Sequence, residues 1–162
     1  MSDFLNSKDV EILKALRNDC RKPMGLVGDA VGISKATVSR RVSKLEEDGI
    51  IKSYDLNVDS NKLGIMKSLV FMQIVGSPAG LVIEQLQAYK EIATIYKSFG
   101  DHNIVCVMYT RSVDELYDVI QTKLLKMPSV RNVEVDILVD EMRVNPNSDL
   151  DIYRIGLGQD RE

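Results

Sequence analysis

Residues 33–49 read ISKATVSRRVSKLEEDG and predict a helix with one apolar face and one basic face. Ser34 is of the type that caps the start of a helix, and Gly49 is of the type that ends one. At 100° per residue the apolar side carries Val38, Val42 and Leu45. The opposite side and its flanks are small, hydroxylated or basic: Ala36, Thr37, Ser39, Arg40, Ser43 and Lys44. Such a face suits the major groove of DNA, where small residues allow close approach and cations meet phosphates.

The residues around this helix predict a winged helix-turn-helix over residues 1–60. Capping side chains at residues 6–9 begin a first helix that ends near residue 19. Residues 24–31 predict a short second helix, closed by Gly32, and residues 50–58 alternate weakly and predict a two-stranded wing. The first-helix residues expected to pack against the third helix are Val10, Leu13 and Leu16. This layout is that of a DNA-binding module.

The distribution of charge supports DNA binding although the net charge of −3 does not. Residues 1–54 hold ten Lys/Arg and eight Asp/Glu, whereas the rest of the chain holds eleven and sixteen. No acidic residue interrupts the cations Lys35, Arg40, Arg41 and Lys44 between Ile33 and Leu45. A basic stripe on one helix, rather than the overall charge, is what a DNA contact requires.

The rest of the chain predicts a second domain of the α+β class. Residues 61–66 are polar and read as a linker, and residues 142–162 read as a tail without clear periodicity. Between them, over residues 67–141, the order of elements is β-α-β-β-α-β, which is the ferredoxin-like arrangement. The strands are expected at 69–75, 92–99, 104–109 and 130–139, and the helices at 77–89 and 112–126.

Composition excludes several other classes of protein. No apolar run approaches the roughly 20 residues that span a bilayer, and no signal peptide begins the chain, so the cytoplasm is the expected location. Cys20 and Cys106 lie far apart and are expected to be buried free thiols. One histidine, no metal-spaced ligand set, no phosphate loop and no Ser/His/Asp set give no basis for an enzyme, a metal site or a cofactor.

Two features of the second domain allow either a structural or a ligand-binding interpretation. Gly100-Asp101-His102-Asn103 separates two predicted strands, and Gly, Asp and Asn are ordinary hairpin residues. Glu134 and Asp136 alternate on the last strand and therefore share a face, which would favour a ligand with a polar or basic side chain or would simply be solvated.

Residues 33–51 resemble the recognition-helix signature of the Lrp/AsnC, or feast/famine, regulators. Residues 9–16 resemble the first helix of that family, and the likeness extends to about Val139. Arg41 lies near the packed side of the helix, where it would reach a phosphate along the helix edge. The DNA-binding residues that the resemblance and the helix face together predict are Ser34, Lys35, Ala36, Thr37, Ser39, Arg40, Arg41 and Lys44.

The same resemblance implies an amino-acid effector. In that family a Gly-Asp loop holds the amino and carboxylate groups of a small amino acid between subunits. Carried over, Gly100 permits close approach and Asp101 binds the ammonium, while His102 departs from the aromatic or acidic residue frequent there. The predicted effector-binding residues are Gly100, Asp101, His102, Asn103, Glu134 and Asp136.

The sequence therefore predicts a transcription regulator that binds double-stranded DNA and responds to a small amino acid. The resemblance implies homodimers that assemble into octamers, and the apolar strands favour dimerisation through the sheets. Two alternatives stay open. One is an architectural DNA-binding protein without an effector, and the other is an amino-acid-sensing module that acts through protein contacts.

Overall fold

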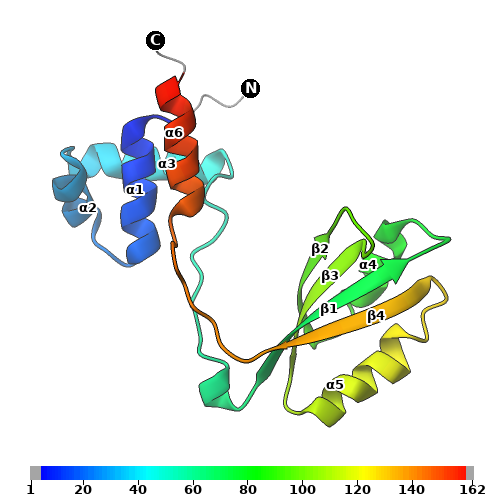
Figure 1. Ribbon diagram of the computed structural model, residues 1–162. Helices are drawn as coiled ribbons and strands as arrows, with labels where there is room; N and C mark the ends of the chain where they lie inside the picture. Colours follow the sequence, from blue (N-terminus) through cyan, green and yellow to red (C-terminus); the bar gives the residue numbers. More distant parts are fainter. Residues whose placement is uncertain (1–4, 160–162) are drawn as a thin grey trace. The chain divides into compact units, whose positions relative to one another are not determined.

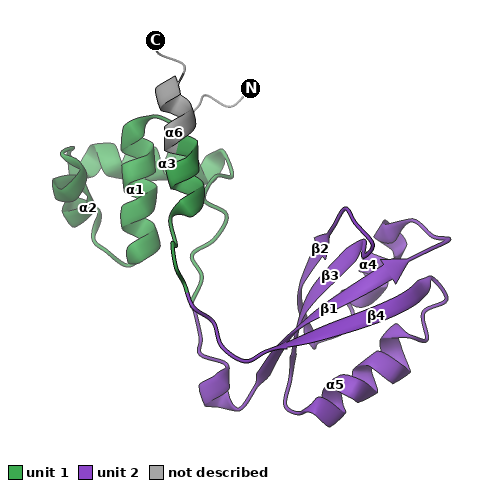
Figure 2. Cartoon of the chain, in the orientation of Figure 1, with its two compact units in different colours: residues 1–56, 143–162 green, residues 57–142 purple. Residues whose placement is uncertain are grey.

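The computed structural model describes the backbone of residues 5–159 and the side chains of residues 5–153. The chain divides into two compact units (Figure 2). The first contains residues 1–56 and residues 143–162, and the second contains residues 57–142. The division falls at residue 56, within the stretch predicted to be a wing, and the end of the chain is part of the first unit.

Unit 1 is built on three helices, α1 (Ser7–Asn18), α2 (Met24–Val31) and α3 (Lys35–Glu47) (Figure 1). The side chain of Asn6 accepts hydrogen bonds from the backbone of residues 8 and 9, and Asp9 bonds back to the Asn6 backbone, which is a capping box. Gly32, at φ 74°, closes α2. The core residues shared by the three helices are Ile12, Leu16, Val27, Val31, Val38 and Val42.

Gly28 lets α2 approach the turn that leads to α3. A Cβ atom at this position would lie 2.5 Å from the carbonyl oxygen of Ile33, so any larger residue would collide with the backbone. The Gly28 carbonyl also accepts a hydrogen bond from the Ile33 backbone at 3.0 Å. The angle between α2 and α3 therefore depends on a glycine inside a helix, where glycine is otherwise unfavourable.

Two expectations for unit 1 are wrong. Residues 50–58 form no strand; the Ile50 and Ile51 backbones bond back to Leu45 at the end of α3. A two-stranded wing needs its own ladder, and this stretch alternates too weakly to bury one side of a hairpin. Cys20 is exposed rather than buried, because it lies beyond the α1 cap at Asp19 and so is not on the packed face of the helix.

The end of the chain is also more ordered than its sequence predicts. Residues 148–159 form α6 (Ser148–Gln159), although no helical period is evident there. α6 lies against α1, and Leu150 on its first turn is buried. The sequence did not reveal this helix because its amphipathic character is weak and its ion-pair partners lie more than 100 residues earlier.

Unit 2 has the predicted ferredoxin-like order of elements. Its strands are β1 (Met66–Ile74), β2 (Ile92–Lys97), β3 (Ile104–Thr110) and β4 (Val130–Leu138). They form one antiparallel sheet in the order β2-β3-β1-β4. Its helices are α4 (Ala79–Leu86) and α5 (Val113–Val119), the latter continued by a π-helical turn over Ile120–Leu124. Both helices are shorter than predicted, and the expected linker contains a 3₁₀ turn, Asn61–Leu63.

The two faces of the sheet differ. One face packs against α4 and α5 and supplies a core that includes Val70, Met72, Cys106 and Met108, so Cys106 is buried as expected. Alternate residues point to the other face, which no element of unit 2 covers. The half-buried apolar residues on this open face are Leu69, Phe71, Val105 and Val107. Within the described residues, no helix combines the length and apolar character needed to cross a membrane.

Candidate nucleic-acid interface and ligand loop

The outer surface of α3 presents most of the predicted DNA-facing residues. Val38, Val42 and Leu45 are buried against the rest of unit 1, which fixes the rotation of the helix. Ser34 Oγ accepts the Thr37 backbone N–H at 3.2 Å and so caps the helix, and it lies 2.8 Å from Thr37 Oγ1, within hydrogen-bond distance of that hydroxyl. The predicted residues that are exposed are Ser34, Lys35, Ala36, Ser39, Arg40 and Lys44. The structure therefore places a hydroxylated and basic surface on one helix.

Arg41 differs from the other predicted residues because its guanidinium turns toward α1. Its Nη1 atom donates to Asp9 Oδ1 at 2.8 Å, and the side chain is only 27% exposed. Its Nε atom is buried and has no hydrogen-bond partner among the described residues. In this structure Arg41 joins α3 to the start of α1.

Three cations of α3 line one hollow. Arg40, Arg41 and Lys44 share a depression of about 320 Å³ with Asp9 and Asp48. The two carboxylates partly offset the positive charge, and Asp9 does so by binding Arg41 directly. Positive charge at the edge of an exposed helix can bind a phosphate of the DNA backbone, which fixes orientation rather than sequence.

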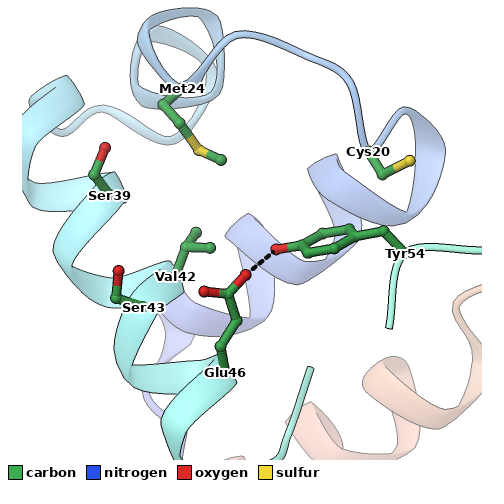
Figure 3. Close-up of a pocket in the computed structure, with 7 residues that line it drawn as sticks. All are labelled: Cys20, Met24, Ser39, Val42, Ser43, Glu46 and Tyr54. Atoms are coloured by element: carbon green, nitrogen blue, oxygen red, sulfur yellow. Dashed lines mark hydrogen bonds between the residues drawn. The ribbon is translucent and has the colours of Figure 1, made fainter. Parts of the chain in front are cut away.

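A second hollow lies on another side of α3 and is partly apolar (Figure 3). Figure 3 shows the Tyr54 hydroxyl pointing to Glu46, to which it donates a hydrogen bond at 2.8 Å. Burial and this hydrogen bond raise the pKa of Tyr54 to about 12. The hydrogen bond holds Tyr54, which follows α3 in the chain, against α3, and it gives the Glu46 carboxylate a partner. The residues that line this hollow are Cys20, Met24, Ser39, Val42, Ser43, Glu46 and Tyr54.

The loop between β2 and β3 has one structural residue and two exposed ones. Asn103 accepts the Ile74 backbone N–H through Oδ1 at 2.6 Å and the Ser98 N–H through its carbonyl at 2.9 Å. Asn103 therefore ties the loop to the end of β1. Gly100 and Asp101 are exposed, and Gly100 has a φ of 155°, which L side chains rarely adopt. A ligand can thus approach the backbone at Gly100.

The structure brings three of the predicted effector residues together on the open face of the sheet. His102 Nε2 lies 3.3 Å from Glu134 Oε1, and the His102 ring lies 5.8 Å from the Phe71 ring, centre to centre. Glu134 pairs with Phe71 and Asp136 pairs with Leu69 in the sheet, so both carboxylates point to this face as predicted. A hollow of about 460 Å³ is lined by Phe71, His102, Glu134, Val135 and Asp136. Gly100, Asp101 and Asn103 do not line it.

Sequence reasoning missed Gly28, Tyr54 and Phe71. A glycine inside a predicted helix was the available signal for Gly28, since that position costs stability unless space demands it. Phe71 alternates with buried residues on a strand, so its position on the open face was readable from the two-residue period. Nothing in the sequence indicates that Tyr54 bonds to Glu46.

Comparison with known proteins gives consistent matches along the chain. Residues 5–52 match the family described as winged helix-turn-helix DNA-binding, and residues 70–147 match the Lrp/AsnC ligand binding domain. The HTH-type transcriptional regulator LrpA of Pyrococcus horikoshii is 34% identical over 143 residues, covering 86% of this chain and 100% of the relative.

Solved structures show the same fold. AsnC of Escherichia coli has a TM-score of 0.78 at 22% identity, with coverage of 89% of this chain and 99% of AsnC. A feast or famine regulatory protein of Mycobacterium tuberculosis, complexed with L-methionine, has a TM-score of 0.78 at 20% identity, with coverage of 87% and 96%.

Proposed function

The chain belongs to the Lrp/AsnC family of HTH-type transcription regulators, and on that premise we propose which of its residues bind DNA and effector. The α3 surface carries the DNA contact: Ser34, Lys35, Ala36, Thr37, Ser39, Arg40 and Lys44. Arg40 and Lys44 meet phosphates or base edges, and the small residues permit entry into the groove. The main role of Arg41 is to hold α3 against α1 through its ion pair with Asp9. The observation that carries this assignment is the exposed basic face opposite buried Val38 and Val42.

Salt dependence of DNA binding tests this face. A site is first selected from a random duplex library, and affinity is then measured at several salt concentrations for wild type, Arg40→Ala and Lys44→Ala. Each variant should bind more weakly, with a slope of log affinity against log salt that is about one unit smaller per lost phosphate contact. Unchanged affinity and slope in both variants would exclude the assigned face.

Competition separates a regulator from an architectural protein of the same fold. A regulator should prefer the selected site over competitor DNA by at least about a thousandfold, whereas an architectural protein should not. Binding to neither DNA would favour a sensing module that acts through protein contacts. The proposed role is not enzymatic, and the proposed location is the cytoplasm.

The open face of the sheet is the proposed dimer surface. Leu69, Phe71, Val105 and Val107 form a contiguous apolar strip on β1 and β3, which pair directly. A second copy of the chain covers this strip, and further assembly to an octamer follows the pattern implied by the family. A two-fold dimer would read half-sites about one helical turn apart, roughly 34–36 Å. Sedimentation across concentrations measures the assembly.

A small amino acid is the proposed effector, held at the loop of Gly100 and Asp101. Two structurally similar proteins carry L-methionine, which supports an amino acid as the class of ligand. Asp101 binds its ammonium, exposed backbone at Gly100 meets its carboxylate, and His102, Glu134 and Asp136 face its side chain. Binding one arrangement better than another shifts the population toward that arrangement.

Thermal unfolding in the presence of each of the twenty amino acids tests the effector. At least one amino acid should raise the melting temperature, because a ligand that binds only the folded state stabilises it. Asp101→Ala should abolish that rise, and Asp114→Ala, an exposed acidic residue at the start of α5, should leave it unchanged. If no amino acid shifts melting at millimolar concentration, the effector proposal fails and the DNA proposal stands.

A further inference from the structure

The C-terminal helix α6 lies beyond the part of the chain that matches the family. The match to the ligand-binding domain ends at residue 147, and α6 begins at Ser148. Its partner is the first helix of the DNA-binding unit, so the chain leaves unit 1, forms the ligand-binding domain and returns to unit 1. Neither the family match nor the proposed function assigns a role to this return.

The contact between α6 and α1 is matched in charge. Arg17 binds both carboxylate oxygens of Asp149, with Nη2 3.0 Å from Oδ2, and its Nη1 also donates to the Pro146 carbonyl at 2.9 Å. One turn earlier on α1, Lys14 pairs with Asp151. Cations three residues apart share a face of α1, and both acidic residues lie in the first turn of α6, where the helix dipole favours negative charge.

Apolar and polar contacts complete the docking of α6. Leu150, between the two aspartates, is 8% exposed. The Tyr153 hydroxyl donates to the Leu5 carbonyl at 3.3 Å. The ion pairs are partly solvated, so α6 is held by several modest contacts rather than by one strong one.

Both connections between the units are short. On the C-terminal side, Glu141 is still held by unit 2, because it pairs with Lys67 of β1 at 3.1 Å. Pro146 is already held by unit 1, because its carbonyl accepts a hydrogen bond from Arg17. On the N-terminal side, Tyr54 bonds to Glu46, and Asp59 accepts the Lys62 backbone N–H. Residues 142–144 form the first connection and residues 55–58 the second. Because extended chain spans at most about 3.6 Å per residue, each connection can cover only a short distance.

We propose that α6 is a second anchor that limits rotation of the DNA-binding unit relative to the ligand-binding domain. A unit held by one chain can swivel about it, whereas a unit held by two short chains cannot swivel freely. Arg17 and Asp149 are the positioning residues of this anchor. The inference rests on the proposed function, because its consequence is a fixed spacing between the two half-sites that a dimer reads.

The second anchor also continues from a strand that carries proposed effector residues. β4 holds Glu134 and Asp136 and ends at Leu138, ten residues before α6 begins. A change in β4 on ligand binding therefore has a direct covalent route to the helix that grips α1. In a chain without α6, the residues after β4 would not lead back to the DNA-binding unit.

Half-site spacing tests the anchor. On the selected site, insertion of 5 bp between half-sites turns one half-site to the opposite side of the duplex, and wild type should lose affinity by about tenfold or more. Arg17→Asp releases α6 and should reduce that loss to about threefold or less. The double variant Arg17→Asp/Asp149→Arg restores the ion pair and should restore the wild-type loss. Arg21→Asp makes the same charge change at a side chain that is 93% exposed and lies near Asp19, so it should not alter the loss of affinity that the insertion causes.

Amide hydrogen exchange of residues 148–153 reports docking without DNA. Protection should be present in wild type and the double variant and lost in Arg17→Asp. If wild type and Arg17→Asp lose affinity equally on the insertion, although protection is lost only in Arg17→Asp, the anchor proposal is wrong and the DNA proposal still stands. Absence of DNA binding in every protein would overturn both, and unprotected α6 in wild type would overturn the anchor alone.

Discussion

Arg41 Nη1 lies 2.8 Å from Asp9 Oδ1, and the other oxygen of the same carboxylate accepts the Asn6 backbone N–H at 3.1 Å. The Asp9 side chain thus takes part in the cap of α1 and also holds α3 against α1. The residue that sequence places at the edge of the DNA face is, in the fold, engaged with a helix cap.

This relationship predicts that Arg41 contributes to the stability of unit 1, whereas Arg40 contributes to DNA binding. Asp9→Ala should lower the free energy of unfolding by about 2 kcal/mol, since it removes a cap and one partner of a half-buried ion pair. Arg41→Ala should lower it by about 1 kcal/mol. Urea unfolding measures both changes. Arg40→Ala is the matched control and should change stability by less than about 0.5 kcal/mol while weakening DNA binding. A destabilised Arg40→Ala with a stable Arg41→Ala would reverse the assignment.

Gly28→Ala should destabilise unit 1 by about 2 kcal/mol or more, because its Cβ would lie 2.5 Å from the Ile33 carbonyl oxygen. Gly25→Ala, on the same helix, meets no atom within 4 Å and should be neutral or stabilising by up to about 1 kcal/mol. Thermal unfolding of both variants checks the pair. Equal effects at the two glycines would contradict the close approach of α2 to the turn.

The buried carboxylate of Glu91 should depend on Lys123. Lys123 Nζ lies 3.0 Å from Glu91 Oε1, and Glu91 is 7% exposed. Burial opposes ionisation, but the hydrogen bond and charge of Lys123 outweigh it and keep the pKa of Glu91 below its usual range. Lys123→Met should cost about 3 kcal/mol at pH 7, because it leaves a buried charge unpaired.

A second substitution and a pH series control that prediction. Glu91→Leu/Lys123→Met removes both charges and should recover most of the lost stability. The cost of Lys123→Met should shrink as pH falls through the carboxyl range, because protonation removes the unpaired charge. A cost that is independent of pH would show that the variant acts through packing.

The docking of α6 should weaken in acid. The hydrogen bond from Arg17 holds the pKa of Asp149 below its usual value of 3.8. A carboxyl group with a lowered folded-state pKa contributes stability above its unfolded pKa and loses that contribution as pH falls through the folded pKa. Protection of residues 148–153 against hydrogen exchange should therefore persist at pH 6 and decline below about pH 4. Asp149→Asn should show reduced protection that no longer depends on this titration.

Local sequence signals are enough to predict the three helices of unit 1 and the order of helices and strands along unit 2. Both rest on local signals: Asn6 and Ser34 cap helices, Gly32 and Gly49 end them, and two-residue alternation marks the strands. Capping and periodicity act within a few residues, so they are readable without knowing the fold. The shared face of Glu134 and Asp136 follows from the same alternation.

Contacts between residues far apart in the sequence could not be predicted and became visible only in the folded chain. It buried Ile12 more fully than Leu13, left residues 50–58 without a strand and exposed Cys20. It also turned Arg41 to Asp9 and placed α6 on α1, through partners 32 and more than 100 residues apart. Ion pairs and close backbone approaches of this kind depend on geometry in space, and no local pattern encodes them. The sequence therefore identifies the helix proposed to read DNA, and the fold shows what holds that helix in place.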